Sequence, residues 1–191
     1  MLAGGRSARF GSDKLAAIVH GMPLVHHPIL RLAEVCREVL VVVAPGAGDP
    51  VLPLAAPARV LHDATEGEGP LAGVLAALTE TVTDWAIVAG GDMPDLRISV
   101  LLEMLKVAGE SGADAVTLQD GEAFRPLPVV VRSKIARDAA HALLHAGERR
   151  LRALPEALRT AVIDETTWVG LDPERATLRD VDEPGDLERE E

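Results

Sequence analysis

Short apolar runs of strand length alternate with longer amphipathic runs of helix length along most of this chain. Residues 38–44 read EVLVVVA, a continuous β-branched run of the kind found in strands that are covered on both faces. Similar apolar runs occupy residues 59–62, 85–89, 113–118 and 129–132. This alternation is typical of α/β proteins. We therefore predict a Rossmann-like, three-layer α/β/α fold with a mostly parallel sheet.

Four helices are predicted between these strands, each from apolar residues three or four positions apart. The apolar stripes are Leu71, Val74, Leu75, Leu78 and Val82; Leu101, Met104, Leu105 and Ala108; Ile135, Ala139, Leu143 and Ala146; and Ile29, Leu32, Ala33 and Cys36. Pro70 suits the first turn of the first helix, Ser99 is a candidate N-cap of the second, and Gly147 ends the third. We expect the helix around Ile29 to begin near Pro28.

Composition limits the classes of function that are open to the chain. Its 191 residues fit one domain, 1–191, and 48% of them are hydrophobic, which favours a packed core. The net charge of −11 opposes binding to nucleic acids and to anionic membranes. With two Phe, two Trp and no Tyr, the chain also lacks the aromatic platforms on which single-strand binders stack bases.

Cysteine content and hydropathy favour a cytoplasmic protein. The only cysteine, Cys36, excludes an internal disulfide and suits a reducing compartment. Its apolar helical surroundings predict a buried structural thiol. We find no signal peptide and no membrane span, because proline interrupts the most apolar stretches.

The opening residues 2–14, LAGGRSARFGSDK, are the strongest candidate for an anion-binding loop. Paired glycines let successive backbone N–H groups face one side of a loop, and Arg6, Arg9 and Lys14 add positive charge. The spacing from Gly5 to Lys14 does not fit a Walker A motif. The alternative is an ordinary glycine-rich turn with solvated cations.

This opening resembles the signature LAGG-x-S-x-R-F-G-x-D-K of the MobA-type molybdenum cofactor guanylyltransferases, which are MobA-like NTP transferases of the nucleotide-diphospho-sugar transferase-like superfamily. Four further segments follow in the family's order: GPLAG at 69–73, GDMP at 91–94, AGERR at 146–150 and DEPGDL at 182–187. The resemblance covers nearly the whole chain and implies a nucleotidyltransferase-type fold. It implies an enzyme that transfers GMP from GTP to the molybdopterin form of the molybdenum cofactor, releasing diphosphate.

Ligands of open α/β sheets bind beyond the carboxyl ends of the strands, where the opening loop, Asp63 and Asp92 are all expected. With the resemblance, this predicts GTP contacts from Leu2, Ala3, Gly4, Gly5, Lys14, Asp63, Gly73 and Asp92. Lys14, Arg9 and Asp92 are the predicted catalytic residues. Asp92 is also the predicted Mg²⁺ ligand, since Mg²⁺ prefers carboxylate oxygens beside phosphates; the alternative is an Asx turn ahead of Pro94.

Asp182 is a candidate second ligand of Mg²⁺, with the start of a terminal helix before Pro184 as the alternative. The family usually has Asn-Val-Asn where this chain has Asp180-Val181-Asp182, which leaves the choice of base and acceptor open. The resemblance implies that Arg125, Arg149 and Arg150 bind the acceptor; solvated surface charges are the alternative. His141 and His145 have a spacing that zinc sites use, but no HExxH pattern accompanies them, which favours a surface or packing role.

Two further expectations concern the start of the chain and its protein partners. Only Met1 to Ala3 precede the paired glycines, so we expect a clipped first strand, through either a mis-assigned chain start or a truncated copy. In the first case, residues encoded upstream should add an apolar strand. Transient contact with cofactor-delivering proteins or molybdoenzymes is a further expectation. The rival functions are a cytidylyltransferase or another nucleotidyltransferase acting on a related phosphorylated acceptor, and a nucleotide-binding module without activity.

Overall fold

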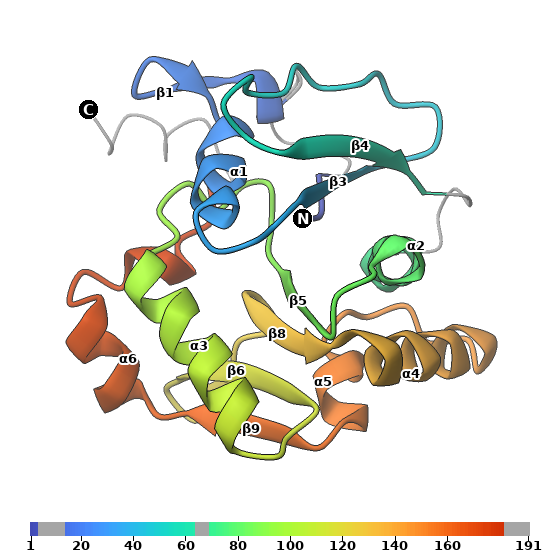
Figure 1. The fold of residues 1–191 in the computed structure, drawn as a ribbon, viewed down its shortest axis with the longest axis vertical. Coiled ribbons are helices and arrows are strands. Elements are labelled where there is room, and N and C mark those ends of the chain that lie inside the picture. The colour runs from blue at the N-terminus through green and yellow to red at the C-terminus, as the bar shows by residue number, and fades with distance from the viewer. Residues whose placement is uncertain (4–13, 64–68, 182–191) are drawn as a thin grey trace.

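The computed structural model describes residues 1–3, 14–63 and 69–181, and Figure 1 shows their arrangement. Gly4, Gly5, Arg9 and Asp182 therefore lie outside the described residues. The helices are α1 (His26–Ala33), α2 (Pro70–Glu80), α3 (Ile98–Glu110), α4 (Ser133–His145), α5 (Ala153–Ala157) and α6 (Glu165–Leu171), with short 3-10 turns η1 (Lys14–Ala16) and η2 (Ala176–Leu178). The strands are β1 (Ile18–Val19), β2 (Met22–Pro23), β3 (Val39–Val43), β4 (Ala58–His62), β5 (Trp85–Val88), β6 (Ala115–Asp120), β7 (Ala123–Phe124), β8 (Val129–Arg132) and β9 (Thr160–Ile163).

The first residues of the chain connect the two parts of the sheet. Strands β3 and β4 pair in parallel, and Leu2 makes parallel bridges both to Val42 in β3 and to Gly90 just after β5. Beyond β5 the order continues through β8 and β6, with β9 paired to β6. Met1 to Ala3 therefore lie between β3 and the segment that follows β5.

The predicted α/β class is confirmed, but the prediction of a mostly parallel sheet is wrong around β8. This strand runs antiparallel to both of its neighbours, β5 and β6, and β7 is also antiparallel to β6. The reason is the short connection from β6 to β8, residues 121–128 with β7 inside it. A parallel return needs a crossover of about a dozen residues or more, so a connection this short can only reverse the chain.

Helices cover both faces of the sheet, which gives the three layers. In Figure 1, α3 and α6 lie on the left of the strands, and α2 and α4 lie on the right. Alternate residues of one strand enter different cores: Val116 and Leu118 pack with α3, whereas Ala115 packs with α2 and α4. This period-two division is what strands covered on both faces produce.

Details of the predicted helices need four corrections. The cap of α3 is Arg97 rather than Ser99, whose hydroxyl donates to the carbonyl of Leu171. Val82 lies beyond the end of α2 and is 98% exposed. The buried apolar positions of α4 are Ala136 and Ala140, while Ile135 is exposed. Cys36 follows the end of α1 and is only half-buried, because the helix ends at Ala33.

Candidate functional site

Lys14 and Asp92 form an ion pair at the carboxyl end of β5. Lys14 begins η1, and Asp92 lies in the turn that follows β5. The Lys14 Nζ to Asp92 Oδ2 distance is 3.0 Å, and the exposed fractions of the two side chains are 10% and 34%. A cation from the opening segment and a carboxylate from the GDMP segment are thus held together, with the carboxylate still open to solvent.

The two glycines before Asp92 allow this turn to pack closely. A Cβ added at Gly90 would lie 2.4 Å from Asp92 Oδ1, so any side chain there would displace the carboxylate. A Cβ added at Gly91 would lie 3.1 Å from the carbonyl oxygen of Leu2, to which the Gly91 N–H donates. The turn is therefore shaped by its contact with the first residues of the chain and by the position of Asp92.

Backbone hydrogen bonds fix Leu2 and Ala3 at this edge. The Leu2 N–H donates to the Ala89 carbonyl at 2.9 Å, and the Ala3 N–H donates to the Val42 carbonyl at 2.7 Å. Ladder bonds on both sides leave these residues little freedom. Leu2 and Ala3 are therefore fixed at the carboxyl ends of β3 and β5.

A second group of predicted residues meets on the other side of Leu2. A Cβ added at Gly73, in the first half of α2, would lie 3.2 Å from Leu2 Cδ2 and 3.9 Å from Asp63 Oδ2. Asp63 directly follows β4, and its N–H donates to the carbonyl of Val43. The structure thus brings Leu2, Asp63 and Gly73 together, and Leu2 connects this corner to the Lys14–Asp92 pair.

The last described residue, Val181, binds the backbone of Asp92. Its N–H donates to the Asp92 carbonyl at 2.9 Å, and its buried side chain packs with Val19 and Leu24. The C-terminal part of the chain therefore returns to the turn after β5. Sequence reasoning missed Val181, although its position beside the candidate ligand Asp182 was a usable signal.

Comparison with known proteins identifies the family. Residues 1–162 match the model of the MobA-like NTP transferase domain. The chain belongs to the MobA-like NTP transferases. Proteins named probable molybdenum cofactor guanylyltransferase are similar to it: one from Mycobacterium bovis is 35% identical over 86% of this chain and 83% of its own length, and one from Deinococcus radiodurans is 33% identical over 84% and 80%.

Solved structures share the fold of this MobA-like NTP transferase. The crystal structure of molybdopterin-guanine dinucleotide biosynthesis protein A from Archaeoglobus fulgidus has a TM-score of 0.77 at 22% identity, covering 100% of this chain and 94% of that one. The 2-C-methyl-D-erythritol 4-phosphate cytidylyltransferase from Thermus thermophilus has a TM-score of 0.71 at 17% identity, covering 98% and 94%. At these identities the likeness concerns the fold.

The donor set around Asp92 fits a Mg²⁺ ion that is shared with a bound polyphosphate. In the part of the chain that the structure describes, no three His, Cys, Asp or Glu side chains gather into a metal site, and His141 and His145 in α4 have no third ligand of that kind. Mg²⁺ does not need such a cage, since it usually takes one or two carboxylates together with substrate phosphates and water. The Asp92 carboxylate meets this requirement, because it is partly exposed and the neighbouring Gly90 has no side chain to obstruct it.

The three candidate acceptor-binding arginines each have partners within the protein. Arg149 donates to the carbonyls of Leu144 and Glu148 at the end of α4, and Arg150 pairs with Glu148 at 2.6 Å. The side-chain hydrogen bond from Arg150, together with the backbone N–H groups of Arg150 and Arg149, which also donate to the Glu148 carboxylate, lowers the pKa of Glu148 to about 2.

The candidate arginines also differ in their location relative to α2. The carbonyl oxygen of Arg149 would lie 3.0 Å from a Cβ added at Gly69, so the turn after α4 packs against the start of α2. Arg125 instead pairs with Asp120, at 3.1 Å, and donates to the carbonyl of Leu178. Arg149 is therefore the arginine whose backbone packs next to the helix that carries Gly73.

Among the residues that the structure describes, no helix is both long enough and apolar enough to cross a membrane.

Proposed function

We propose that this MobA-like NTP transferase is a molybdenum cofactor guanylyltransferase, which transfers GMP from GTP to the molybdopterin form of the cofactor. The observation that carries the proposal is the Lys14–Asp92 pair beside the Gly90–Gly91 turn, at the edge where α/β sheets bind ligands. The names of relatives at 33–35% identity, which this chain covers over about four-fifths of their length, support the choice of substrates.

The two groups of residues on either side of Leu2 are proposed to bind different parts of the nucleotide. Guanine presents the acceptor O6 and donors at N1 and N2. The carboxylate of Asp63 lies close to Gly73, since a Cβ added there would be 3.9 Å from Asp63 Oδ2, and together they can bind a base or its ribose. The phosphates then lie toward Lys14, Asp92 and the paired glycines Gly4 and Gly5. Their N–H groups and those of the following loop would donate to phosphate oxygens.

The proposed reaction is a direct nucleotidyl transfer. An oxygen of the terminal phosphate of molybdopterin attacks the α-phosphorus of GTP and forms a new P–O bond. The bond from the α-phosphorus to the oxygen that bridges to the β-phosphorus breaks, and diphosphate leaves with that electron pair. Because the attacking oxygen is already anionic, no general base is required. Catalysis then consists of in-line positioning and neutralisation of negative charge by Lys14 and Arg9.

Asp92, with Asp182 as a second candidate, would hold the Mg²⁺. When bound, the ion supplies charge neutralisation between the carboxylates and the polyphosphate. The ion pair with Lys14 limits the repulsion between Asp92 and the phosphates before the ion arrives.

The acceptor is proposed to bind near the turn after α4 through Arg149 and Arg150, with Arg125 as the third contact. Arg150 is 80% exposed, so its guanidinium can exchange Glu148 for a phosphate at small cost. Arg149 holds backbone carbonyls, which favours a role in shaping the turn while its backbone faces α2.

Diphosphate release tests this proposal. Purified protein is mixed with GTP, Mg²⁺ and molybdopterin that carries the metal, and diphosphate is measured with and without the acceptor. We expect release that depends on both GTP and acceptor. Binding of GTP in a thermal-shift assay without any acceptor-dependent release would instead identify a nucleotide-binding module.

A further inference from the structure

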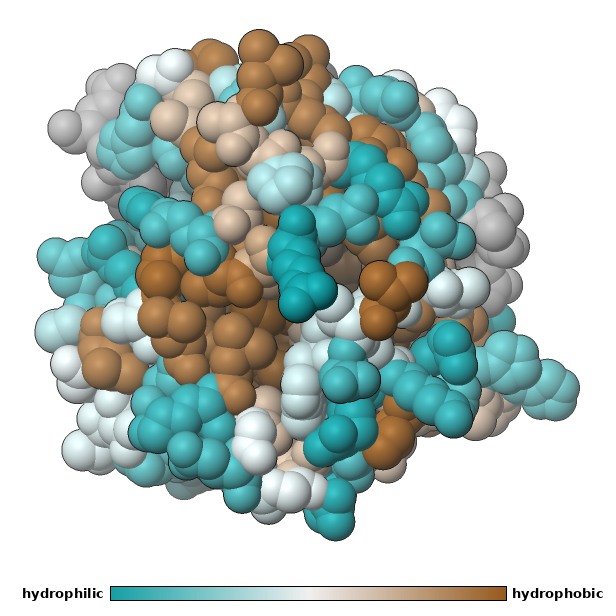
Figure 2. Space-filling model, in the orientation of Figure 1, coloured by the Kyte–Doolittle hydropathy of each residue, from teal (hydrophilic) through white to brown (hydrophobic). Residues whose placement is uncertain are grey.

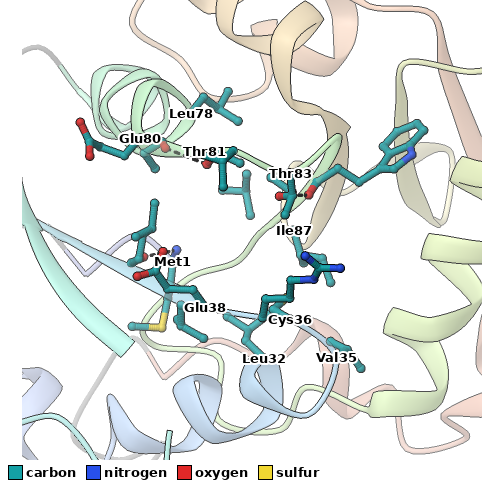
Figure 3. A pocket seen from close by; sticks show the side chains of 18 of the residues that line it. Met1, Leu32, Val35, Cys36, Glu38, Leu78, Glu80, Thr81, Thr83 and Ile87 are labelled. Atoms are coloured by element: carbon teal, nitrogen blue, oxygen red, sulfur yellow. Dashed lines mark hydrogen bonds between the residues drawn. The ribbon is translucent and has the colours of Figure 1, made fainter. Parts of the chain in front are cut away.

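The strand that leads into the Asp92 turn borders a groove. It pairs with β8 on one side, while on its other side a groove of about 640 Å³ opens between β5 and the first residues of β3. Figure 2 shows a hollow near the centre of this face, and in Figure 3 Met1 and Ile87 lie on opposite sides of the groove. Contacts from outside the sheet therefore matter for the position of the turn.

The C-terminal segment, residues 172–181, supplies such contacts to the loop of residues 92–97 that follows β5. Val181 binds the carbonyl of Asp92 at the first end of the loop, with an N–H to oxygen distance of 2.9 Å. Arg97, at the other end of the loop, contacts the earlier part of the same segment. The segment and the loop thus lie side by side in opposite directions, and the loop is held at both ends.

Thr177 provides the buried contact at Arg97. Its side chain is fully buried in η2, and its Oγ1 accepts a hydrogen bond from the Arg97 N–H at 3.2 Å. The N–H of Thr177 donates in turn to Asp172 Oδ2 at 2.7 Å. The other carboxylate oxygen of Asp172, whose side chain is 1% exposed, lies 3.6 Å from Arg97 Nε, which is too far for a hydrogen bond but close enough for attraction. The three residues therefore form one network.

The ion pairs on the surface of this contact hold the loop less firmly. Arg179 lies 3.8 Å from Asp95, and Arg97 pairs with Glu174 at 2.7 Å, but Arg179 and Glu174 are 49% and 69% exposed. Exposed pairs contribute little, because solvent screens the charges and the long side chains lose freedom. A backbone N–H that loses its acceptor away from water is much more costly. The Thr177 hydroxyl is therefore the contact best suited to fix the far end of the loop.

We propose that Thr177 is a positioning residue for Asp92, which holds the loop 92–97 so that the Asp92 carboxylate keeps its place for Mg²⁺. This inference rests on the proposed function, since that function assigns the metal to Asp92. Without the hydroxyl, the Arg97 N–H loses this acceptor, and the pairing between loop and segment opens more often. Thr177 thus acts through the loop and not on the substrate directly.

The test exchanges the hydroxyl of Thr177 for a methyl group. Thr177→Val keeps the shape of the side chain and removes the acceptor, whereas Thr177→Ser keeps the acceptor. Thr117→Val is the matched control, because Thr117 is also fully buried and its Oγ1 has no hydrogen-bond partner among the described residues. An effect of Thr177→Val that the control lacks therefore reports the contact with Arg97, and not the burial of a threonine.

Hydrogen exchange at the Val181 amide measures the pairing without any substrate. We expect Thr177→Val to raise its exchange rate about 10-fold, and Thr177→Ser and Thr117→Val to leave it unchanged. Asp172→Asn removes the attraction to Arg97 and should raise the rate in the same direction, which keeps the inference testable if the valine variant does not fold. Equal exchange rates in Thr177→Val and Thr117→Val would overturn the inference.

Turnover and its Mg²⁺ dependence provide the second readout. Thr177→Val is expected to lower turnover, or to raise the Mg²⁺ concentration for half-maximal rate, by about 10-fold or more, as is usual for residues behind a metal ligand. A merely structural threonine would change the melting temperature alone, so an unchanged Mg²⁺ titration would overturn the inference. If the unmodified protein releases no diphosphate, the proposed function fails, while exchange at Val181 still decides whether Thr177 holds the Asp92 loop.

Discussion

Lys14 Nζ lies 3.0 Å from Asp92 Oδ2, although the two residues are 78 positions apart in the sequence. The pair joins the two segments that most resemble the nucleotidyltransferase signature, one from the opening of the chain and one from the turn after β5. Because Lys14 is nearly buried while Asp92 is one-third exposed, the pair presents an anion to solvent with a cation held behind it. This arrangement underlies the first predictions.

Replacing Lys14 by alanine is expected to slow turnover about 10²–10³-fold, the usual loss for one electrostatic contact to the transition state. The pair is partly exposed, so its stability contribution should be about 1 kcal/mol, or 2–4 °C in melting temperature. Lys106→Ala is the matched control, because Lys106 is 57% exposed and pairs with Glu103 at 3.1 Å within α3. Steady-state rates are measured for the unmodified protein, Lys14→Ala and Lys106→Ala. Near-normal turnover of Lys14→Ala would show that the phosphates bind elsewhere.

Asp92→Asn is expected to remove most of the activity and the dependence on Mg²⁺, because the amide cannot bridge a cation to the phosphates. Asparagine forms the same Asx turns as aspartate, so a purely structural Asp92 would tolerate the change. Activity is measured across a Mg²⁺ titration, with Asp49→Asn as the control because Asp49 is 66% exposed and pairs with the exposed His62, 2.7 Å away. An unchanged titration curve would identify Asp92 as a turn residue.

Gly90→Ala is expected to lower activity strongly, since the new Cβ would lie 2.4 Å from Asp92 Oδ1 and displace that carboxylate. Gly109→Ala in α3 is the control, because a Cβ there meets nothing within 4 Å. The control should stabilise the helix by about 0.5–1 kcal/mol and leave turnover unchanged. Rates and melting temperatures are compared, and equal rates in the two variants would show that the carboxylate position is unimportant.

The buried amine of Met1 predicts a pH dependence of stability. Burial lowers its pKa from 8.0 to about 6, so between these values the unfolded chain binds more protons than the folded one. The free energy of unfolding should therefore rise with pH from 6 to 8, by on the order of 2 kcal/mol. Melting temperatures of the protein and of its Nα-acetylated form are measured across this range. An identical pH dependence in the acetylated form would assign the effect to other groups.

Strands with continuous β-branched runs were predictable, because a strand that is buried on both faces needs an apolar residue at every position. β3 and β8 are examples. The direction of β8 was not predictable from its apolar run, since direction depends on the length of the connection that precedes it. β9 was missed because Thr160–Ile163 is short and carries an exposed Val162.

The sequence predicted which residues lie at the carboxyl edge of the sheet, but not the contacts among them. Glycine pairs and carboxylates that follow apolar runs indicate which residues reach the carboxyl edge of the sheet. They do not indicate that Lys14 pairs directly with Asp92, or that Val181 binds the Asp92 backbone. Both contacts depend on tertiary packing of distant segments. The partners of Arg149 and Arg150 could not be predicted from the sequence either, because they depend on the conformation of the turn that ends α4.

Competition among the four nucleoside triphosphates tests the central claim most directly. Equal concentrations of GTP, CTP, ATP and UTP are incubated with the protein, Mg²⁺ and metal-loaded molybdopterin, and the dinucleotide products are separated and identified. A site that hydrogen-bonds one base edge leaves polar groups unpaired with the wrong base, at about 1–3 kcal/mol for each group. We therefore predict the guanine dinucleotide in 10- to 100-fold excess or more. Predominance of the cytosine dinucleotide would contradict the guanylyltransferase assignment and leave a cytidylyltransferase with the same fold.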